Sequence, residues 1–127
     1  MDGNNVVGAS GGRWWRDRPA AVRRLLARLS CYAERSDEDV ELVLDVPQAD
    51  LPEGVHGRIV VRYATRRGRD AADDRIRERV AELSGGAGAG PIEVVTSDRA
   101  LRDDVRALGA SVVGAGTFVG RLHEHGC

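Results

Sequence analysis

The sequence predicts an α/β protein with three layers, in which helices cover both faces of a mainly parallel sheet. Short apolar runs typical of strands alternate along the chain with segments of helical periodicity. Such alternation is typical of parallel strands joined by crossover helices. The 127 residues are one domain's length, and 42% hydrophobic with 31% charged residues excludes a disordered chain. We therefore expect a single domain over residues 1–127.

The first half of the chain predicts a helix, a strand, a loop and a second strand. The helix begins near Asp17, because a capping acid followed by Pro19 is typical of a helix start. Its apolar face is formed by Val22, Leu25, Leu26, Leu29, Tyr32 and Ala33. Residues 40–44 form an apolar run that ends at Asp45 and predicts a mostly buried strand. The proline-containing residues 47–57 are predicted as a loop, and residues 58–63 (RIVVRY) as the next strand.

The second half repeats the alternation. A helix is predicted from about Asp70, with Ala72, Ile76, Val80 and Leu83 facing inward. Residues 84–91 (SGGAGAGP) are expected to form a flexible glycine-rich loop. A strand over 92–96, a helix over 99–108 and a short strand over 111–113 follow. Residues 117–123 predict one or two helical turns, and residues 123–127 a frayed tail.

Several features of the sequence indicate the cellular compartment and whether the chain enters a membrane. The longest stretch without charge, residues 107–120, is too short and too rich in glycine to cross a bilayer, and the amino terminus has no signal pattern. Cys31 and Cys127 make no disulfide framework or zinc site. We therefore expect a cytoplasmic protein that does not enter a membrane.

Charge is strongly segregated although the net charge is only −1. All 19 cationic residues are arginine; they are concentrated in residues 13–35 and 58–69, while residues 36–53 carry only acids. Basic segments in a neutral chain are compatible with nucleic-acid binding, because the local field matters more than the total charge. Solvated helix and loop faces would give the same pattern.

Acidic residues fall where the predicted strands end. Asp2 opens the chain, Asp45 ends the 40–44 strand, Asp98 follows the 92–96 strand, and Asp73 lies in the first turn of the helix after the 58–63 strand. Ligands of open parallel sheets bind at these carboxyl ends. Oxygen ligands without nearby histidine or cysteine favour magnesium or manganese. The alternative is that the acids are helix caps and turn formers.

Five motifs together resemble the NYN-domain proteins of the YacP-like branch, which belong to the PIN-like nuclease superfamily. They are DGNNV at 2–6, RWWRDRP at 13–19, VLD at 43–45, RGRDAADDRI at 67–76 and VVTSDRALRDDVRALGA at 94–110. The resemblance implies a PIN-like, Rossmannoid α/β/α fold and a metal-dependent endoribonuclease. Ribosome-associated RNA cleavage is known in the branch, so RNA, on the ribosome or free, is the expected partner.

The resemblance also implies the site. Asp2, Asp73 and Asp98 would be catalytic and would bind one or two Mg²⁺ or Mn²⁺ ions, with Asp45 as an outer ligand or support. The supporting residues would be Asn5, Ser97 and Asp74. The family places a hydrophobic strand before the DGNN motif, where this sequence has only Met1, so the first strand is expected to be short or missing. A start site assigned too far downstream and a natural truncation are both compatible with this.

Two segments that would flank the acidic edge are candidate RNA contacts, since tryptophan stacks on unpaired bases and arginine grips phosphate. They comprise Arg13, Trp14, Trp15 and Arg16, and then Arg66, Arg67 and Arg69. The tryptophans could equally form a lid over the core.

Two other functions remain open. A non-catalytic RNA-binding module with a degenerate metal site is the main alternative to the nuclease. A small phosphatase is weaker, because Asp2-Gly-Asn4 lacks the paired aspartates that such an enzyme needs.

Overall fold

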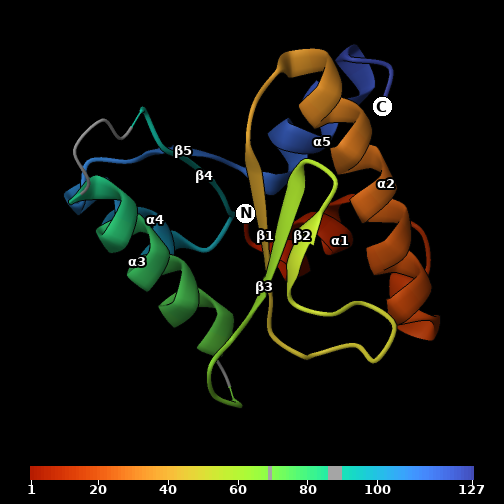
Figure 1. Ribbon diagram of the computed structural model, residues 1–127, viewed down its shortest axis with the longest axis horizontal. Helices are drawn as coiled ribbons and strands as arrows, with labels where there is room; N and C mark the ends of the chain where they lie inside the picture. The colour runs from red at the N-terminus through yellow and green to blue at the C-terminus, as the bar shows by residue number, and fades with distance from the viewer. Residues whose placement is uncertain (69, 86–89) are drawn as a thin grey trace.

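The computed structural model describes residues 1–68, 70–85 and 90–127. Helices α1 (Gly3–Ala9), α2 (Arg18–Ser36) and α5 (Ala115–Glu124) cover one face of the strands. Helices α3 (Ala71–Ser84) and α4 (Arg99–Ala107) cover the other, as Figure 1 shows. The three-layer α/β/α prediction is therefore confirmed.

The strands form two small sheets. One has the order β1-β3-β2, with β1 (Val40–Leu44) parallel to β3 (Ile59–Tyr63) and β2 (Gly54–His56) antiparallel at its edge. The other pairs β4 (Glu93–Val95) in parallel with β5 (Ser111–Val113). The pairing is mainly parallel, as predicted.

Met1 and Asp2 lie between the two sheets, where β1 and β4 face each other. The Val43 amide donates to the Met1 carbonyl at 2.9 Å, and the Asp2 amide donates to the Val95 carbonyl at 2.9 Å. Asp2 thus forms a parallel bridge to Val43. We call this line of contact between β1 and β4 the seam. The predicted short first strand is these two residues, and they hold the carboxylate of Asp2 at the middle of the combined sheet.

Each face of the sheets has its own core. On one face, the side chains of α1, α2 and α5 pack against Leu42, Leu44, Ile59 and Val61. On the other, α3 and α4 bury Val43 and Val94. Strand β1 faces both cores because successive side chains of a strand point to opposite sides. It is therefore a central strand, and residues that follow it lie at the centre of the carboxyl edge.

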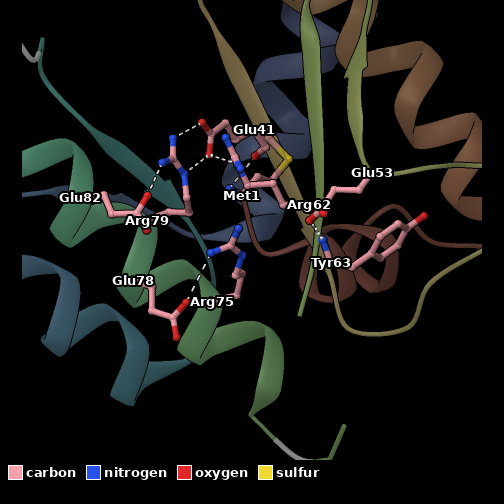
Figure 2. Close-up of polar contacts among 9 residues, drawn as sticks. All are labelled: Met1, Glu41, Glu53, Arg62, Tyr63, Arg75, Glu78, Arg79 and Glu82. Carbon is pink, nitrogen blue, oxygen red and sulfur yellow. Dashed lines mark hydrogen bonds and ion pairs between the residues drawn. The ribbon is translucent and has the colours of Figure 1, made fainter. Parts of the chain in front are cut away.

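An ion-pair network ties α3 to β1 (Figure 2). Arg79 on α3 donates two hydrogen bonds to the Glu41 carboxylate, at 2.6 and 3.0 Å, and Arg62 on β3 donates a third at 3.2 Å. Burial alone would raise the pKa of Glu41, but the Arg79 and Arg62 guanidinium groups outweigh it and hold the pKa below its usual value. The network fixes where α3, and thus the acids of its first turn, lies against the sheet.

Parts of the prediction were wrong. Residues 3–9, for which no helix was predicted, form α1, and the predicted 47–57 loop contains β2. Residues 123–127 do not fray, because α5 continues to Glu124 and the Cys127 amide donates to the Leu122 carbonyl at 2.8 Å. Cys127 also forms a disulfide with Cys31 of α2, which the two widely spaced cysteines of the sequence did not predict.

Two further expectations concern the glycine-rich loop and membranes. Helix α3 extends to Ser84, and residues 86–89 of the predicted 84–91 loop lie outside the described residues. Among the described helices, none has the length and apolar character needed to span a bilayer.

Candidate metal centre

Gly3 allows helix α1 to begin directly against β1. A Cβ atom at this position would lie 2.8 Å from the Val43 carbonyl oxygen, which is closer than real Cβ contacts allow. The short DGNN motif therefore needs glycine after Asp2, because the chain turns from the seam into a helix with no room for a side chain. This turn keeps Asp2 and Asn5 at the carboxyl edge of the sheets.

Three carboxylates from two helix starts converge at this edge. Asp70 precedes α3, Asp73 lies in its first turn, and Asp98 precedes α4. One oxygen from each lies within 4.8 Å of the others. We call these three residues the acidic cluster. Asp70 has a left-handed backbone conformation with φ of 63°, which aspartate tolerates better than most residues.

Asp98 is fixed by its role as a helix cap. Its Oδ1 accepts a hydrogen bond from the Leu101 amide at 2.9 Å, and its own amide donates to the Thr96 hydroxyl at 3.1 Å. The Thr96 hydroxyl in turn donates to Oδ2 of Asp2 at 2.9 Å. Fully buried Thr96 thus connects Asp2 on the seam to Asp98 in the cluster.

Asp2 lies behind the cluster and is not one of its three members. It is 1% exposed. Burial raises the pKa of Asp2, and the Asp98 charge adds to this, while the Thr96 hydroxyl and the nearby amino terminus oppose it. The charge of Asp2 nevertheless affects the cluster, because after burial it is the next contribution to the raised pKa of Asp73.

The electrostatics of the cluster are those of a cation site. Burial, followed by the charges of Asp2, Asp98 and Asp70, raises the pKa of Asp73 to about 6. Converging carboxylates must take up a proton or a cation, because like charges at such distances repel strongly. The donors are all hard oxygens, and no histidine or cysteine belongs to the cluster. This donor set fits Mg²⁺ or Mn²⁺.

Asn5 and Ser97 join the elements around the cluster. The Asn5 Oδ1 accepts from the Ser97 amide at 3.0 Å, and the Ser97 hydroxyl accepts from the Ala115 amide at 3.0 Å. These contacts connect the loop before Asp98 to α1 on one side and α5 on the other. Both residues therefore lie where a supporting role was predicted.

Asp45 and Asp74 lie outside the cluster. Asp45 forms an ion pair with Arg18, which also donates to the side chain of Asn4. Asp74 pairs with Arg66 and Arg77, and its pKa lies below its usual value, with Arg66 as the main cause. The predicted set of acids is thus only partly brought together, because arginines hold two of them.

The candidate RNA-contact residues lie in different environments. Trp14 packs partly against the core, as a lid would, whereas Trp15 is 64% exposed. The two tryptophans therefore differ, and only Trp15 presents an exposed ring. Arg13, Arg16 and Arg67 are exposed. Arg66 is bound to Asp74, and Arg69 lies outside the described residues.

The sequence analysis missed Asp70, Thr96 and Arg18. Asp70 was taken only as the start of a helix, a role in which acids are common. Thr96 is the last residue of the VVT run. Because threonine is common in strands, the sequence pattern does not reveal that its hydroxyl binds a carboxylate. The signal for Arg18 was its place in the RWWRDRP motif, which was used for the family resemblance and the helix start but not to assign Arg18 a partner.

Comparisons with known proteins identify a family and two similar folds. The family model of the YacP-like NYN domain matches residues 1–126. Two crystal structures of Rae1 (YacP) from Bacillus subtilis resemble the fold, one of them of a point mutant. The mutant gives a TM-score of 0.74 and covers 98% of this chain and 73% of its own. The other gives 0.73, with 98% and 72% covered, and both are 22% identical in sequence. No curated protein sequence matches the chain.

Proposed function

The chain belongs to the YacP-like NYN domain family, and from this premise we propose that it is a Mg²⁺- or Mn²⁺-dependent endoribonuclease. The observation that carries the proposal is the acidic cluster, in which Asp70, Asp73 and Asp98 bring carboxylate oxygens within 4.8 Å of one another. The cluster lies at the carboxyl edge of parallel strands, where ligands of such sheets bind. RNA is the substrate that the family resemblance implies.

Asp73 and Asp98 would hold the ion or ions, with Asp70 as a third ligand from the described residues. Bound there, one or two such ions would supply an activated water and charge stabilisation for the leaving oxygen of the phosphodiester. The chain's own part is to fix the ligands before substrate arrives. The Leu101 amide and the Thr96 hydroxyl hold Asp98, and the network around Glu41 holds the second half of α3 against β1.

Asp2 would influence these ligands through its charge without belonging to the cluster. Its charge raises the pKa of Asp73, which strengthens that carboxylate's preference for a cation. We also assign Asp45 a supporting role, because its carboxylate binds Arg18 rather than facing the cluster. Asn5 and Ser97 would keep the loop before Asp98 in place, and Asp74 would orient Arg66.

The RNA backbone would be bound by exposed cations around the edge. Arg13, Arg16 and Arg67 are available for phosphate, and the exposed ring of Trp15 for an unpaired base. Arg66 and Arg69 complete the proposed basic surface, and Trp14 would brace Trp15, with which it forms an edge-to-face contact. The family resemblance implies that the RNA is free or ribosome-bound, and the proposed place of action is the cytoplasm.

The test is cleavage of a mixed single-stranded and structured RNA in Mg²⁺, in Mn²⁺ and in EDTA. Asp98→Asn is the informative variant, because asparagine still caps a helix while the carboxylate charge is lost. Asp103→Asn, an exposed change on the same helix, is the matched control. We expect metal-dependent internal cuts by the wild type and by Asp103→Asn, and a loss of at least 100-fold in Asp98→Asn.

The same assay distinguishes the alternative. A non-catalytic RNA-binding module would bind the RNA with strong salt dependence, in EDTA as well as in metal, and would cut nothing. That result would replace the nuclease with the binding module. Release of phosphate from small esters without internal cuts would instead indicate a phosphatase.

A further inference from the structure

A groove of about 490 Å³ lies beside the acidic edge, between the start of α2 and the segment that follows β1. One wall is formed by Arg18, Pro19 and Arg23, and the other by residues 46–50. Its volume is within the range of small-molecule sites in proteins. The groove includes none of the residues of the acidic cluster.

The walls combine apolar surface with a few polar groups. Val46, Pro47 and Ala49 supply the apolar part, and Val46 is 55% exposed, which is unusual for a large apolar side chain. Arg18 and Arg23 supply guanidinium groups, and Gln48 an amide whose oxygen has no hydrogen-bond partner. Apolar surface beside arginine forks suits a group that is flat and apolar at one end and anionic at the other.

The groove is joined to the acidic edge through Arg18. This guanidinium contacts both Asn4 and Asp45. Asn4 is next to Asn5, whose side chain accepts from the Ser97 amide beside Asp98. The wall of the groove is thus connected to the cluster through the first turn of α1, which is the observation that relates the groove to the acidic edge.

We propose that the groove is a subsite for a nucleoside next to the scissile phosphodiester, an inference that rests on the proposed nuclease function. The base and sugar lie against Val46, Pro47 and Ala49. The adjoining phosphate takes the place of a carboxylate on Arg18 or Arg23, which are paired with Asp45 and Asp50 in the free protein. Arginine favours this exchange, because its fork binds phosphate in two hydrogen bonds.

The decisive variant is Val46→Asp, with Val55→Asp as the matched control. Both valines are exposed, and Val55 lies on β2, outside the groove walls. The probe is a single-stranded 12-nucleotide RNA, cleaved in Mg²⁺ over a range of concentrations. We expect Val46→Asp to raise KM at least fivefold with kcat within twofold of wild type, because the new charge repels the phosphate without touching the cluster. The control should change neither value by more than twofold.

A crosslinking measurement locates the nucleoside directly. The same RNA, carrying one 4-thiouridine at successive positions, is irradiated with the Asp98→Asn protein in Mg²⁺, and the labelled peptide is identified by mass spectrometry. Crosslinks to residues 46–50 from a position adjacent to the cleavage site are expected. Thermal unfolding of each variant checks that it is folded.

The outcomes separate the two proposals. If the wild type cleaves but Val46→Asp has unchanged KM and residues 46–50 give no crosslink, the subsite is wrong and the nuclease stands. If an acidic peptide protects residues 46–50 from crosslinking as well as unlabelled RNA does, the groove is an anionic-peptide site and the subsite is again wrong. If the wild type neither binds nor cleaves RNA, both proposals fail.

Discussion

The carboxyl of Asp73 is costly to ionise in the absence of a cation, because burial and three neighbouring acids raise its pKa to about 6. In the unfolded chain the same group titrates near 4. Between these values the folded state binds more protons than the unfolded state, so this group's contribution to stability falls as the pH rises through that window.

Asp73→Asn should therefore stabilise the metal-free protein at pH 7.5. We expect the midpoint of thermal unfolding in EDTA to rise by about 2–4 °C, a modest amount because the group is partly screened by solvent. At pH 4 the gain should vanish, since the wild-type carboxyl is then protonated in the folded state. Asp103→Asn, an exposed change on α4, is the control. A gain of equal size at both pH values would contradict the assigned pKa.

At the residue scale, the sequence predicted the acids that follow a clear pattern. Asp98 comes directly after an apolar strand and before a helix, and Asp73 lies in the first turn of a periodic helix, so topology alone brings them to one edge. That Asp45 and Asp74 lie outside the cluster could not be predicted. Each is held by arginines, Arg18 in one case and Arg66 with Arg77 in the other. Sequence spacing does not reveal which of 19 arginines pairs with which acid.

At the element scale, the contact between α3 and β1 depends on Glu41. Its carboxylate accepts from Arg79 and Arg62, whose side chains are 16% and 26% exposed. Removing the charge leaves two poorly solvated guanidinium groups without their partner, which costs more than the loss of an exposed ion pair.

Glu41→Gln should lower the free energy of unfolding by about 1–3 kcal/mol in urea titrations at pH 7. Glu78→Gln is the matched control, because Glu78 is on α3, is half exposed and forms an i,i+3 ion pair with Arg75; it should cost less than about 0.5 kcal/mol. Since the pKa of Glu41 is held below its usual value, the stabilisation is present above pH 4.5 and is lost as the pH falls. The free energies of unfolding of the two variants should therefore become equal near pH 3. If Glu41→Gln is still less stable at that pH, its loss of stability comes from packing and not from the charge.

The elements that the sequence predicted have an apolar pattern of helical or strand period. Helices α2, α3 and α4 and strands β1, β3, β4 and β5 all carry one, and the predicted turns over 117–123 lie within α5. Helix α1 was not predicted because its sequence, GNNVVGA, is rich in poor helix formers. Its conformation is stabilised by packing of Val6 and Val7 in the core. Strand β2 has only three residues and forms because it pairs with β3 across the turn at Gly57, where φ is 63°.

At the scale of the whole molecule, the disulfide between Cys31 and Cys127 joins α2 to the end of the described chain. The bond spans 96 residues. A crosslink of this span restricts the unfolded chain strongly, and such bonds typically contribute about 2–4 kcal/mol. The bond also holds α5 against α2, in the core that supports β1 and β3.

Cys31→Ala should therefore lower the free energy of unfolding by about 2–4 kcal/mol under non-reducing conditions. Dithiothreitol should lower the stability of the wild type by a similar amount and leave the variant unchanged. Urea titrations with and without the reductant measure both. Two titratable thiols in the untreated protein would show that the bond does not form.

The fold class could be read from the sequence because alternation of strands and helices constrains the whole chain. The division of the strands into two sheets could not, since it depends on how far Met1 and Asp2 extend between β1 and β4. The disulfide was missed for a similar reason: two cysteines so far apart in sequence carry no spacing signal, and only the packing of α5 on α2 brings them together.

The seam has a mechanical consequence for the acidic cluster. Asp70 and Asp73 follow the sheet that contains β1 and β3, whereas Asp98 follows β4 of the other sheet, so the cluster straddles the joint. Like charges on these carboxylates would repel one another across this joint, where the backbone hydrogen bonds of Met1 and Asp2 join the two sheets. A cation on the cluster would attract carboxylates that follow both sheets, and would therefore hold the two sheets together. Binding of the cation would therefore stabilise the contact between the two sheets as well as the site itself.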